Sequence, residues 1–180
     1  MVKIYNLRIV PHDVIFEEID QFKRKFETLF SKQSLVRSKP HITLAAFEMD
    51  TQQENTMLKA FNELSSIEKF KLEIEGFDIF ENNANVLLLK IAANKEVKHI
   101  HTLVKILWIR DLHRKLTTIK IPATPHITIS KTSGTKMLHD SLSYFSKIEY
   151  IRQLAVNKLT LVSRRQHETW DWEYHIPLGE

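Results

Sequence analysis

Apolar residues recur along this chain with two different spacings, one typical of strands and the other typical of helices. An apolar residue at every second position is typical of a half-buried strand, and this pattern marks residues 2–10 and residues 41–47. A spacing of three and four residues is typical of a helix with one buried face. This second spacing predicts helices over residues 14–29, 52–65, 95–112 and 136–145.

The remaining apolar runs predict strands between these helices. Residues 70–80 and 86–93 indicate a hairpin with residues 81–85 as its turn, and Asp13 is placed to cap the first helix. Further strands are expected at residues 126–130, 154–162 and 170–176, with a basic loop at residues 113–120. This order of elements predicts an α+β fold. No Gly-, Ser- or Pro-rich linker divides the chain, so we expect one domain, residues 1–180, made of two packed lobes; the last strands can return to either lobe.

The tetrapeptide Pro-His-Ile-Thr occurs twice, once in each half of the chain. The copies are residues 40–43 and 125–128, and each is followed by a large apolar residue, Leu44 or Ile129. A single copy would be a common way to begin a strand, with its histidine hydrogen-bonded at the surface. Two copies in the same context favour a shared function instead.

The histidine and the threonine of each copy share one face of the expected strand. His41 lies with Thr43, and His126 lies with Thr128. Two histidines, one neutral and one protonated, can act as base and acid in the cleavage of a phosphodiester near neutral pH. The threonine hydroxyls can donate hydrogen bonds to non-bridging phosphate oxygens. We therefore predict two catalytic histidines and two phosphate-binding threonines, with no metal or other cofactor.

The composition narrows the choice of function. The 180 residues are 43% hydrophobic and 27% charged, which is usual for a globular protein. The chain has no cysteine, which excludes disulfides, thiolate metal ligands and cysteine nucleophiles. Three glycines are too few for a Walker loop or a dinucleotide-binding loop, which disfavours NTP hydrolysis and hydride transfer on a Rossmann unit. A net charge of +4 is compatible with an anionic substrate.

The same sequence bears on location and partners. No apolar run approaches the length of a membrane span, and residues 1–6 lack the apolar stretch of a signal peptide. We expect a cytoplasmic protein. Nothing in the sequence indicates a membrane or a protein partner.

On its two His-x-Thr motifs, the chain resembles the two-histidine (2H) phosphoesterase superfamily, the LigT-like or 2′-5′ RNA ligase family. His41-Ile42-Thr43-Leu44 and His126-Ile127-Thr128-Ile129 match both family motifs, and the resemblance extends over nearly the whole chain. It implies a bilobal, pseudo-two-fold fold with two antiparallel-rich sheets, outer helices and a central groove that both histidines face. It also implies metal-independent hydrolysis of a 2′,3′-cyclic phosphate at an RNA end or in a small nucleotide, leaving a 2′-phosphate.

The segments that follow the motifs depart from those of bacterial RNA cyclic phosphodiesterases. Such enzymes often continue the first motif with Arg-Phe and the second with Arg, whereas this chain has Ala45-Ala46-Phe47 and Ser130-Lys131. Phe47 and Lys131 are therefore candidate substrate contacts. Lys90, which interrupts an apolar strand, is a third.

Other interpretations fit the same residues. One is 2′-5′ RNA ligase or 2′-5′ phosphodiesterase activity, and another is a non-catalytic module that binds RNA ends or nucleotides. A pure binder would not need both an acid and a base. The remaining histidines, His99 and His101 among them, lack a carboxylate cluster at ligand spacing, so we expect no metal site. Trp170 and Trp172 are expected on one strand face, as a stacking platform or a lobe interface.

Overall fold

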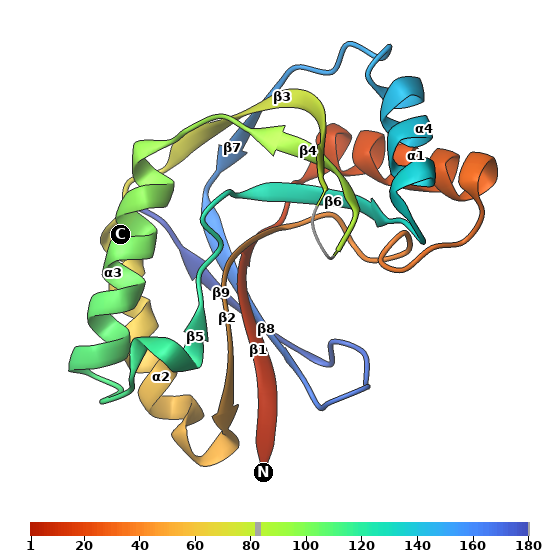
Figure 1. Cartoon of the computed structure of the whole chain (residues 1–180). Coiled ribbons are helices and arrows are strands. Elements are labelled where there is room, and N and C mark those ends of the chain that lie inside the picture. Colours follow the sequence, from red (N-terminus) through yellow and green to blue (C-terminus); the bar gives the residue numbers. More distant parts are fainter. Residues whose placement is uncertain (82–83, 180) are drawn as a thin grey trace.

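The computed structural model describes residues 1–81 and 84–179 of the chain, so the predicted turn at 81–85 lies partly outside the described residues. Figure 1 shows how the elements are arranged. The strands are β1 (Val2–Ile9), β2 (Ile42–Asp50), β3 (Phe70–Phe80), β4 (Val86–Ile91), β5 (Ile119–Lys120), β6 (His126–Lys131), β7 (Arg152–Val156), β8 (Lys158–Arg164) and β9 (Trp172–Pro177). The helices are α1 (Asp13–Phe30), α2 (Glu54–Phe61), α3 (Lys95–Arg110) and α4 (Thr135–Phe145), with 3₁₀ turns at Thr51–Gln53, Asn62–Ser66 and Leu116–Thr118.

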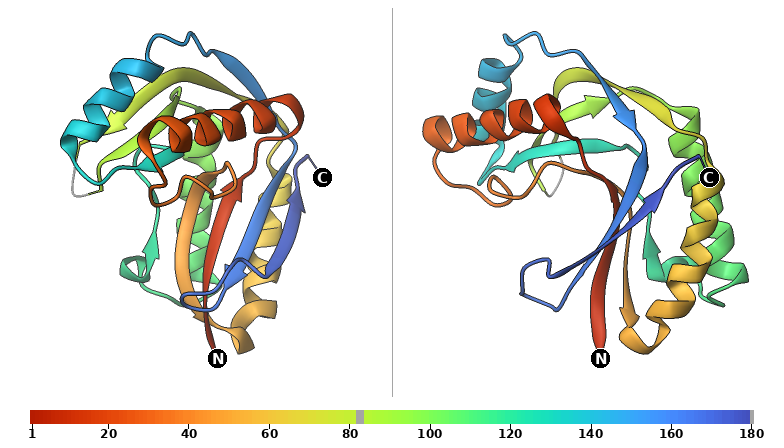
Figure 2. Two further views of the ribbon diagram at one scale, coloured as in Figure 1. Left: turned by 90° about the vertical axis from the view of Figure 1, so that its right-hand side faces the viewer. Right: turned by 180° about the vertical axis from the view of Figure 1, so that it is seen from behind.

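Within the described residues, nine strands form one strongly curled antiparallel sheet (Figure 1, Figure 2). The strand order is β7-β3-β4-β6-β2-β1-β8-β9, with β5 beside β2. The motif strands β2 and β6 are neighbours in the middle of this order, where Ile42 pairs with Ile127. The two predicted sheets are therefore two antiparallel halves that meet at the motif strands. The α+β class with helices on the outside is confirmed.

Each half of the sheet, with its helices, is one lobe. The β6 lobe contains β3, β4, β6 and β7, and the β2 lobe contains β1, β2, β5, β8 and β9. Helix α1 packs against β6 and α4, whereas α3 packs against β2 and α2. Each motif strand is thus covered by a helix from the other half of the chain.

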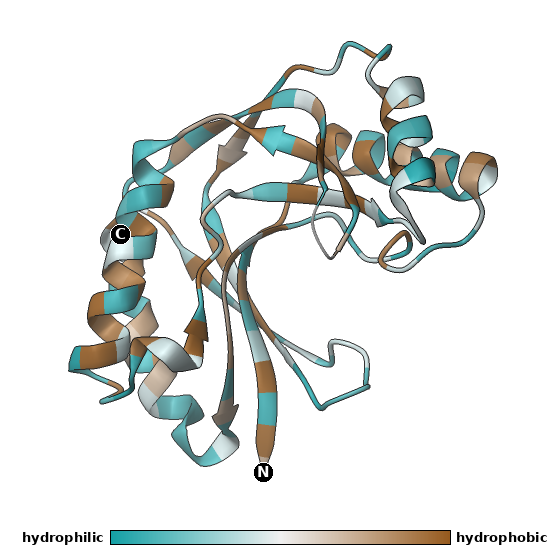
Figure 3. Cartoon of the chain, in the orientation of Figure 1, coloured by the Kyte–Doolittle hydropathy of each residue, from teal (hydrophilic) through white to brown (hydrophobic). Residues whose placement is uncertain are grey.

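Aromatic cores lie under the helices of both lobes. In the β6 lobe, Phe26 stacks with Phe145 at 6.3 Å between ring centroids. In the β2 lobe, Phe47 packs against Tyr5 at 5.4 Å and Trp108 at 4.7 Å. Figure 3 shows the matching hydrophobic bands on the helices and strands. Full burial of one such side chain stabilises the fold by roughly 1.5–3 kcal/mol, and this packing fixes the strands that carry the motifs.

Two local predictions are wrong. Asp13 is the first residue of α1, and His12 occupies the N-cap position, with its Nδ1 2.6 Å from the Asp13 carboxylate. The predicted strand 154–162 is two strands in different lobes, β7 at the edge of the β6 lobe and β8 inside the β2 lobe. The chain crosses between the lobes at Asn157.

Candidate active site

The two His-x-Thr motifs lie on neighbouring antiparallel strands. Ile42 of β2 pairs with Ile127 of β6, and both side chains are fully buried. Leu44 and Ile129, the residues that follow the threonines, are fully buried as well. These apolar side chains anchor the motif strands under the helices. The alternating polar side chains therefore face the concave side of the sheet.

The polar side chains of the motifs share that concave face and are half-buried: His41, Thr43, His126 and Thr128. Extending the Ile42 pairing by one residue in each direction places His41 opposite Thr128 and Thr43 opposite His126. Directly opposed residues in an antiparallel pair have Cβ atoms about 4.5–5.5 Å apart. The two histidines thus lie on one diagonal of this group of four residues, and the two threonines lie on the other.

The backbone ahead of each motif strand holds both imidazoles in the same way. His41 Nδ1 lies 2.8 Å from the Lys39 carbonyl oxygen, and His126 Nδ1 lies 2.9 Å from the Thr124 carbonyl oxygen. A carbonyl oxygen only accepts, so Nδ1 carries the hydrogen in each ring. The neutral tautomer leaves Nε2 free to accept a proton, and the protonated ring can donate one from Nε2.

The surroundings of His41 keep its imidazole neutral at neutral pH. Burial lowers its pKa most, and the positive charge of Arg8 lowers it further. The Lys39 carbonyl opposes these effects, while Lys23 and His126 add smaller decreases. The resulting pKa of about 4 leaves His41 able to take up a proton.

An aromatic ring and a lysine flank His126 from its own lobe. Phe80 meets the imidazole edge to face, with 4.8 Å between centroids and 82° between planes. Lys90 lies directly opposite His126 in the β4–β6 pair, so it shares the concave face. Its Nζ is 3.1 Å from a Glu75 carboxylate oxygen, and its side chain is 53% exposed. This position is compatible with a substrate contact by Lys90, which stays a prediction.

A β-bulge in β6 returns Lys131 to the concave face. The bulge follows Thr128 and turns the fully buried Ser130 toward the core, opposite Leu87. Lys131 therefore lies on the same face as Thr128, although an odd number of positions separates them. The predicted substrate contact by Lys131 fits this location and also stays a prediction.

Phe47 does not face the groove, so its predicted role as a substrate contact is wrong. It is 4% exposed and packs in the core against Tyr5 and Trp108. Simple alternation from Thr43 would place it on the concave face. A bulge between the Thr43 and Ala45 pairings with β1 shifts the phase and turns the ring toward the helices.

Two residues that the sequence analysis missed complete the polar face beside the first motif. Asn6 Nδ2 donates to Thr43 Oγ1 over 3.3 Å, and Arg8 Nε donates to Asn6 Oδ1 over 2.9 Å. A guanidinium only donates, so the Asn6 amide must turn its oxygen to Arg8 and its nitrogen to Thr43. The Thr43 hydroxyl hydrogen is then available for a substrate oxygen. The sequence signal is the pair of polar residues, Asn6 and Arg8, that alternate with apolar residues in the second half of the strand.

Lys23 of α1 is a further residue that the sequence analysis missed. Its side chain is 1% exposed, and Nζ donates to the carbonyls of Thr128 and Ile129 over 2.8 and 2.9 Å. It also donates to the Leu35 carbonyl over 3.1 Å. Burial lowers the pKa of Lys23 to about 8. The signal for this link was a lysine within the apolar stripe of the first helix.

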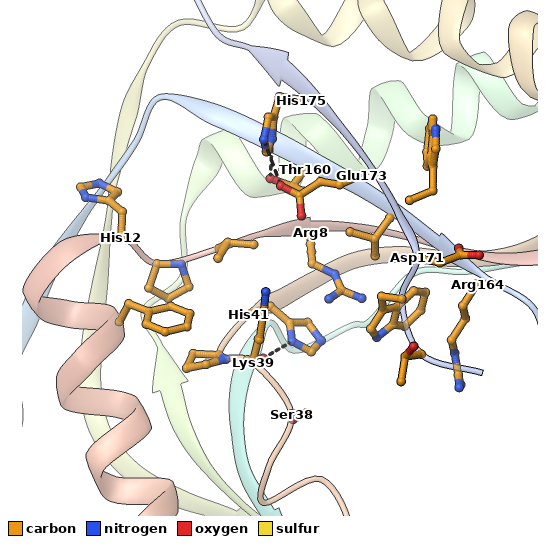
Figure 4. Close-up of a pocket in the computed structure, with 18 of the residues that line it drawn as sticks. Arg8, His12, Ser38, Lys39, His41, Thr160, Arg164, Asp171, Glu173 and His175 are labelled. Atoms are coloured by element: carbon orange, nitrogen blue, oxygen red, sulfur yellow. Dashed lines mark hydrogen bonds and ion pairs between the residues drawn. The ribbon is translucent and has the colours of Figure 1, made fainter. Parts of the chain in front are cut away.

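A cavity of about 800 Å³ adjoins His41 on the concave face of the β2 lobe (Figure 4). Its walls come from β1, β8, β9 and the segments ahead of α1 and β2. Its charged and aromatic lining includes Arg8, Arg164, Trp170, Glu173 and His175. A cavity of this size with a few polar groups is typical of a small-molecule site.

The two tryptophans near the end of the chain have different surroundings. Trp170 is 40% exposed, and the guanidinium carbons of Arg8 and Arg164 lie 4.5 and 5.0 Å from its ring centroid. The Trp172 ring instead meets Tyr5 edge to face at 6.3 Å. The prediction that both rings share a strand face is wrong, because β9 begins only at Trp172.

Neither a metal cage nor a membrane span is evident in the described part of the chain. In residues 1–81 and 84–179, no group of three or more His, Asp or Glu side chains is placed to hold a metal ion. Over the same residues, no helix has both the length and the apolar character needed to cross a membrane.

Comparison with models of protein families shows which family this chain belongs to. The family model described as the 2′-5′ RNA ligase superfamily matches residues 11–168, which include both motifs. The chain belongs to this superfamily. The resemblance to the LigT-like, two-histidine family is thereby confirmed.

Three solved structures share the fold over nearly the full length of this chain. TT0787 of Thermus thermophilus has a TM-score of 0.73 at 14% identity, with 100% of each chain covered. Apo LigT of E. coli has a TM-score of 0.69 at 14% identity, with 97% of each chain covered. Usb1 of Kluyveromyces marxianus has a TM-score of 0.60 at 11% identity, covering 97% of this chain and 98% of its own. No curated protein matches the sequence significantly.

Proposed function

We propose that this protein is a metal-independent phosphodiesterase that hydrolyses a 2′,3′-cyclic phosphate at an RNA end or in a small nucleotide. The observation that carries the proposal is the diagonal pair of His41 and His126, each held through Nδ1 in the tautomer whose Nε2 can accept a proton. One imidazole can serve as base while the other serves as acid. Each role typically accelerates such a reaction by about 10²–10⁴-fold.

The reaction needs one water and one proton transfer at each histidine. Nε2 of neutral His41 takes a proton from water as the water oxygen attacks phosphorus. The bond from phosphorus to the 3′ oxygen breaks, and that oxygen takes a proton from Nε2 of protonated His126. The hydroxyls of Thr43 and Thr128 donate to the non-bridging oxygens, where negative charge builds up. A 2′-phosphate and a free 3′-hydroxyl result, and proton exchange with solvent resets both imidazoles.

The assignment of roles rests on an asymmetry of the groove. Arg8 pairs with Thr43 in the sheet, whereas the apolar Leu88 occupies the matching position opposite Thr128. Burial and the positive charge of Arg8 keep His41 neutral, which suits the role of general base. His126 then supplies the proton to the leaving oxygen.

The cavity beside His41 supports a nucleotide as the substrate class. It is large enough for a nucleoside, and it opens from the first motif along β1, β8 and β9. E. coli LigT, which shares the fold, has been solved in complex with 3′-AMP, with NADP+ and with ATP. We assign the cavity to the nucleoside that carries the cyclic phosphate.

The family description favours a second candidate, 2′-5′ RNA ligation. Ligation would use the same chemistry in the same sense, with a ribose 5′-hydroxyl in place of water as the nucleophile that attacks the cyclic phosphate. The two histidines would keep their roles: His41 would take the proton of that hydroxyl, and His126 would protonate the leaving 3′ oxygen, so that a 2′-5′ linkage results. Hydrolysis occurs if the groove admits water as the acceptor, and ligation occurs if it admits a ribose hydroxyl.

The decisive experiment is an assay of the purified protein in the presence of EDTA. Its substrates would be 2′,3′-cyclic nucleotides, RNA with a cyclic end, and ADP-ribose 1″,2″-cyclic phosphate, with and without a 5′-hydroxyl RNA acceptor. We expect hydrolysis that survives chelation and gives a single regioisomer, the 2′-phosphate. An equal mixture of regioisomers, or activity that needs an added divalent ion, would contradict the mechanism. A joined product would select ligation.

A further inference from the structure

Arg8 places a guanidinium on the concave face beside the first motif. In the sheet it lies between Thr43 of β2 and Thr160 of β8, its partners in the two strand pairings. The residue is 5% exposed, yet it lines the cavity that adjoins His41. Figure 4 shows the Arg8 guanidinium directed toward the side of the cavity that holds the His41 ring.

The hydrogen bonds of Arg8 leave one end of its fork free. Nε donates to Asn6 Oδ1 over 2.9 Å, which fixes the plane of the guanidinium. In the part of the chain that the structure describes, the buried Nη2 has no hydrogen-bond partner. A buried donor without an acceptor is costly, and folded proteins keep few of them. The free donor is therefore a candidate ligand-binding group.

The residues that line the cavity around Arg8 include five Arg and Lys side chains against three carboxylates, which favours an anionic ligand. Glu173, whose charge acts on Arg8, contacts His175 with 3.0 Å between Oε1 and Nε2. Arg164 brings a second cation to the same cavity, and both guanidiniums lie over the Trp170 ring. Phosphate oxygens match a guanidinium fork in both charge and geometry.

Packing alone does not explain an arginine at this position. The matching position in the β6 lobe, opposite Thr128, is held by Leu88, which is 1% exposed. An apolar side chain therefore fills the equivalent place without a buried charge. Burial makes the charged form of Arg8 less favourable and lowers its pKa to about 10. Groups whose pKa is shifted in this way are often found at functional sites.

We propose that Arg8 binds a non-bridging oxygen of the reacting phosphate through Nη2, and that Asn6 sets its orientation. The inference rests on the proposed function, since it assigns Arg8 to the phosphate held between His41 and His126. Asn6 links the Thr43 hydroxyl and the guanidinium in one hydrogen-bonded chain, so both donors face the same anion.

Binding of a phosphate group tests this inference without any need for turnover. Calorimetric titration with inorganic phosphate and with 2′-AMP would compare the wild-type protein with Arg8→Gln and Arg8→Lys. Loss of a charge-assisted hydrogen bond should weaken binding of both probes about 10- to 100-fold in Arg8→Gln. Arg8→Lys should lie between, because lysine keeps the charge and loses the fork. Circular dichroism and thermal unfolding would verify the fold of each variant.

Arg24→Gln is the matched control. Arg24 is exposed on α1, is not among the residues that line the cavity, and donates through Nε to Asp20 over 2.8 Å. Removing its charge should leave the affinity for both probes unchanged. An equal loss in Arg24→Gln and Arg8→Gln would reduce the effect to general electrostatics and overturn the specific assignment.

Kinetics with a cyclic phosphate provide a second readout. In Arg8→Gln, kcat/KM should fall by the same factor as affinity. The acid limb of the pH profile of kcat/KM should move to higher pH, because Arg8 is the neighbouring charge that lowers the pKa of His41 most. A folded Arg8→Gln protein that binds and reacts like the wild type would overturn the inference and leave the proposed function standing. Phosphate binding through Arg8 without hydrolysis by the wild type would overturn the proposed function instead.

Discussion

The ammonium nitrogen of Lys23 lies 2.8 Å from the carbonyl oxygen of Thr128, inside the protein and beneath the second motif. The same nitrogen lies 2.9 Å from the Ile129 carbonyl and 3.1 Å from the Leu35 carbonyl, in the segment that leads to the first motif. One side chain of α1 therefore donates hydrogen bonds to backbone carbonyls near both motifs. It couples the position of Thr128 to that of the loop ahead of His41.

Lys23→Met should loosen this coupling. Methionine fills a similar volume but leaves the buried carbonyls without their donor, so we expect a loss of about 1–3 kcal/mol in the free energy of unfolding. kcat should fall as well, because Thr128 is no longer held. Urea unfolding and steady-state kinetics would measure both. The control is Lys25→Met, on the same helix, where the exposed lysine lies over the Tyr144 ring; equal behaviour of the two variants would argue against the coupling.

His41→Ala and His126→Ala should each lower kcat by about 10²–10⁴-fold, because each removes one proton-transfer group. The fold should survive, since both side chains lie on the concave face and outside the apolar core. His139→Ala is the control, because that histidine is exposed on α4 and contacts Glu81. Full activity in either groove variant would refute the paired mechanism.

Asn6→Ala and Thr43→Ala should each reduce kcat/KM, by less than the histidine variants do. Thr43→Ala removes a donor to phosphate, and Asn6→Ala frees the hydroxyl that the amide orients. Because both act on one contact, the double variant should depart from additivity by about 0.5–3 kcal/mol. A double-mutant cycle on kcat/KM measures this coupling. Strictly additive losses would mean that the amide does not position the hydroxyl.

Stability should depend on pH through His41. Its pKa is about 4 in the folded protein against 6.5 for the free group, so between these values the unfolded chain binds a proton that the folded chain does not. The free energy of unfolding therefore falls as pH drops from 6.5 to 4, by at most about 3 kcal/mol from this group. His41→Ala lacks this contribution, so the stability gap to the wild type should narrow on acidification. Urea titrations at several pH values would show it; a constant gap would contradict the shifted pKa.

Local patterns were enough to predict the motif strands and most elements. The strand predicted at 70–80 is β3, and the helix predicted at 95–112 is α3, which ends at Arg110. Apolar residues recur regularly in both elements. Helix α3 also has a side-chain cap, since the Asn94 side chain accepts a hydrogen bond from the Val97 amide. The shared concave face of His41 and Thr43 followed from alternation alone, since no bulge lies between them.

Features that depend on tertiary pairing were beyond a local reading. The bulge that turns Phe47 into the core is set by the register of β2 against β1. The role of Lys23 depends on carbonyls far away in sequence. The crossing at Asn157 did leave a trace in the sequence: the polar pair Asn157-Lys158 interrupts the apolar positions between Val156 and Leu159. That interruption marks the break between β7 and β8.

The exchange of helices between the halves bears on how this chain could be divided. A cut between β4 and α3 would leave the N-terminal piece with β2 but without α3, and the C-terminal piece with β6 but without α1. Each fragment would expose the apolar back of its own motif strand and so be prone to aggregate alone. Mixed fragments could regain the groove only by assembling together, each lending its helix to the other. The spacing of the two imidazoles is therefore a property of the joint assembly, and neither half-chain holds a working half-site by itself.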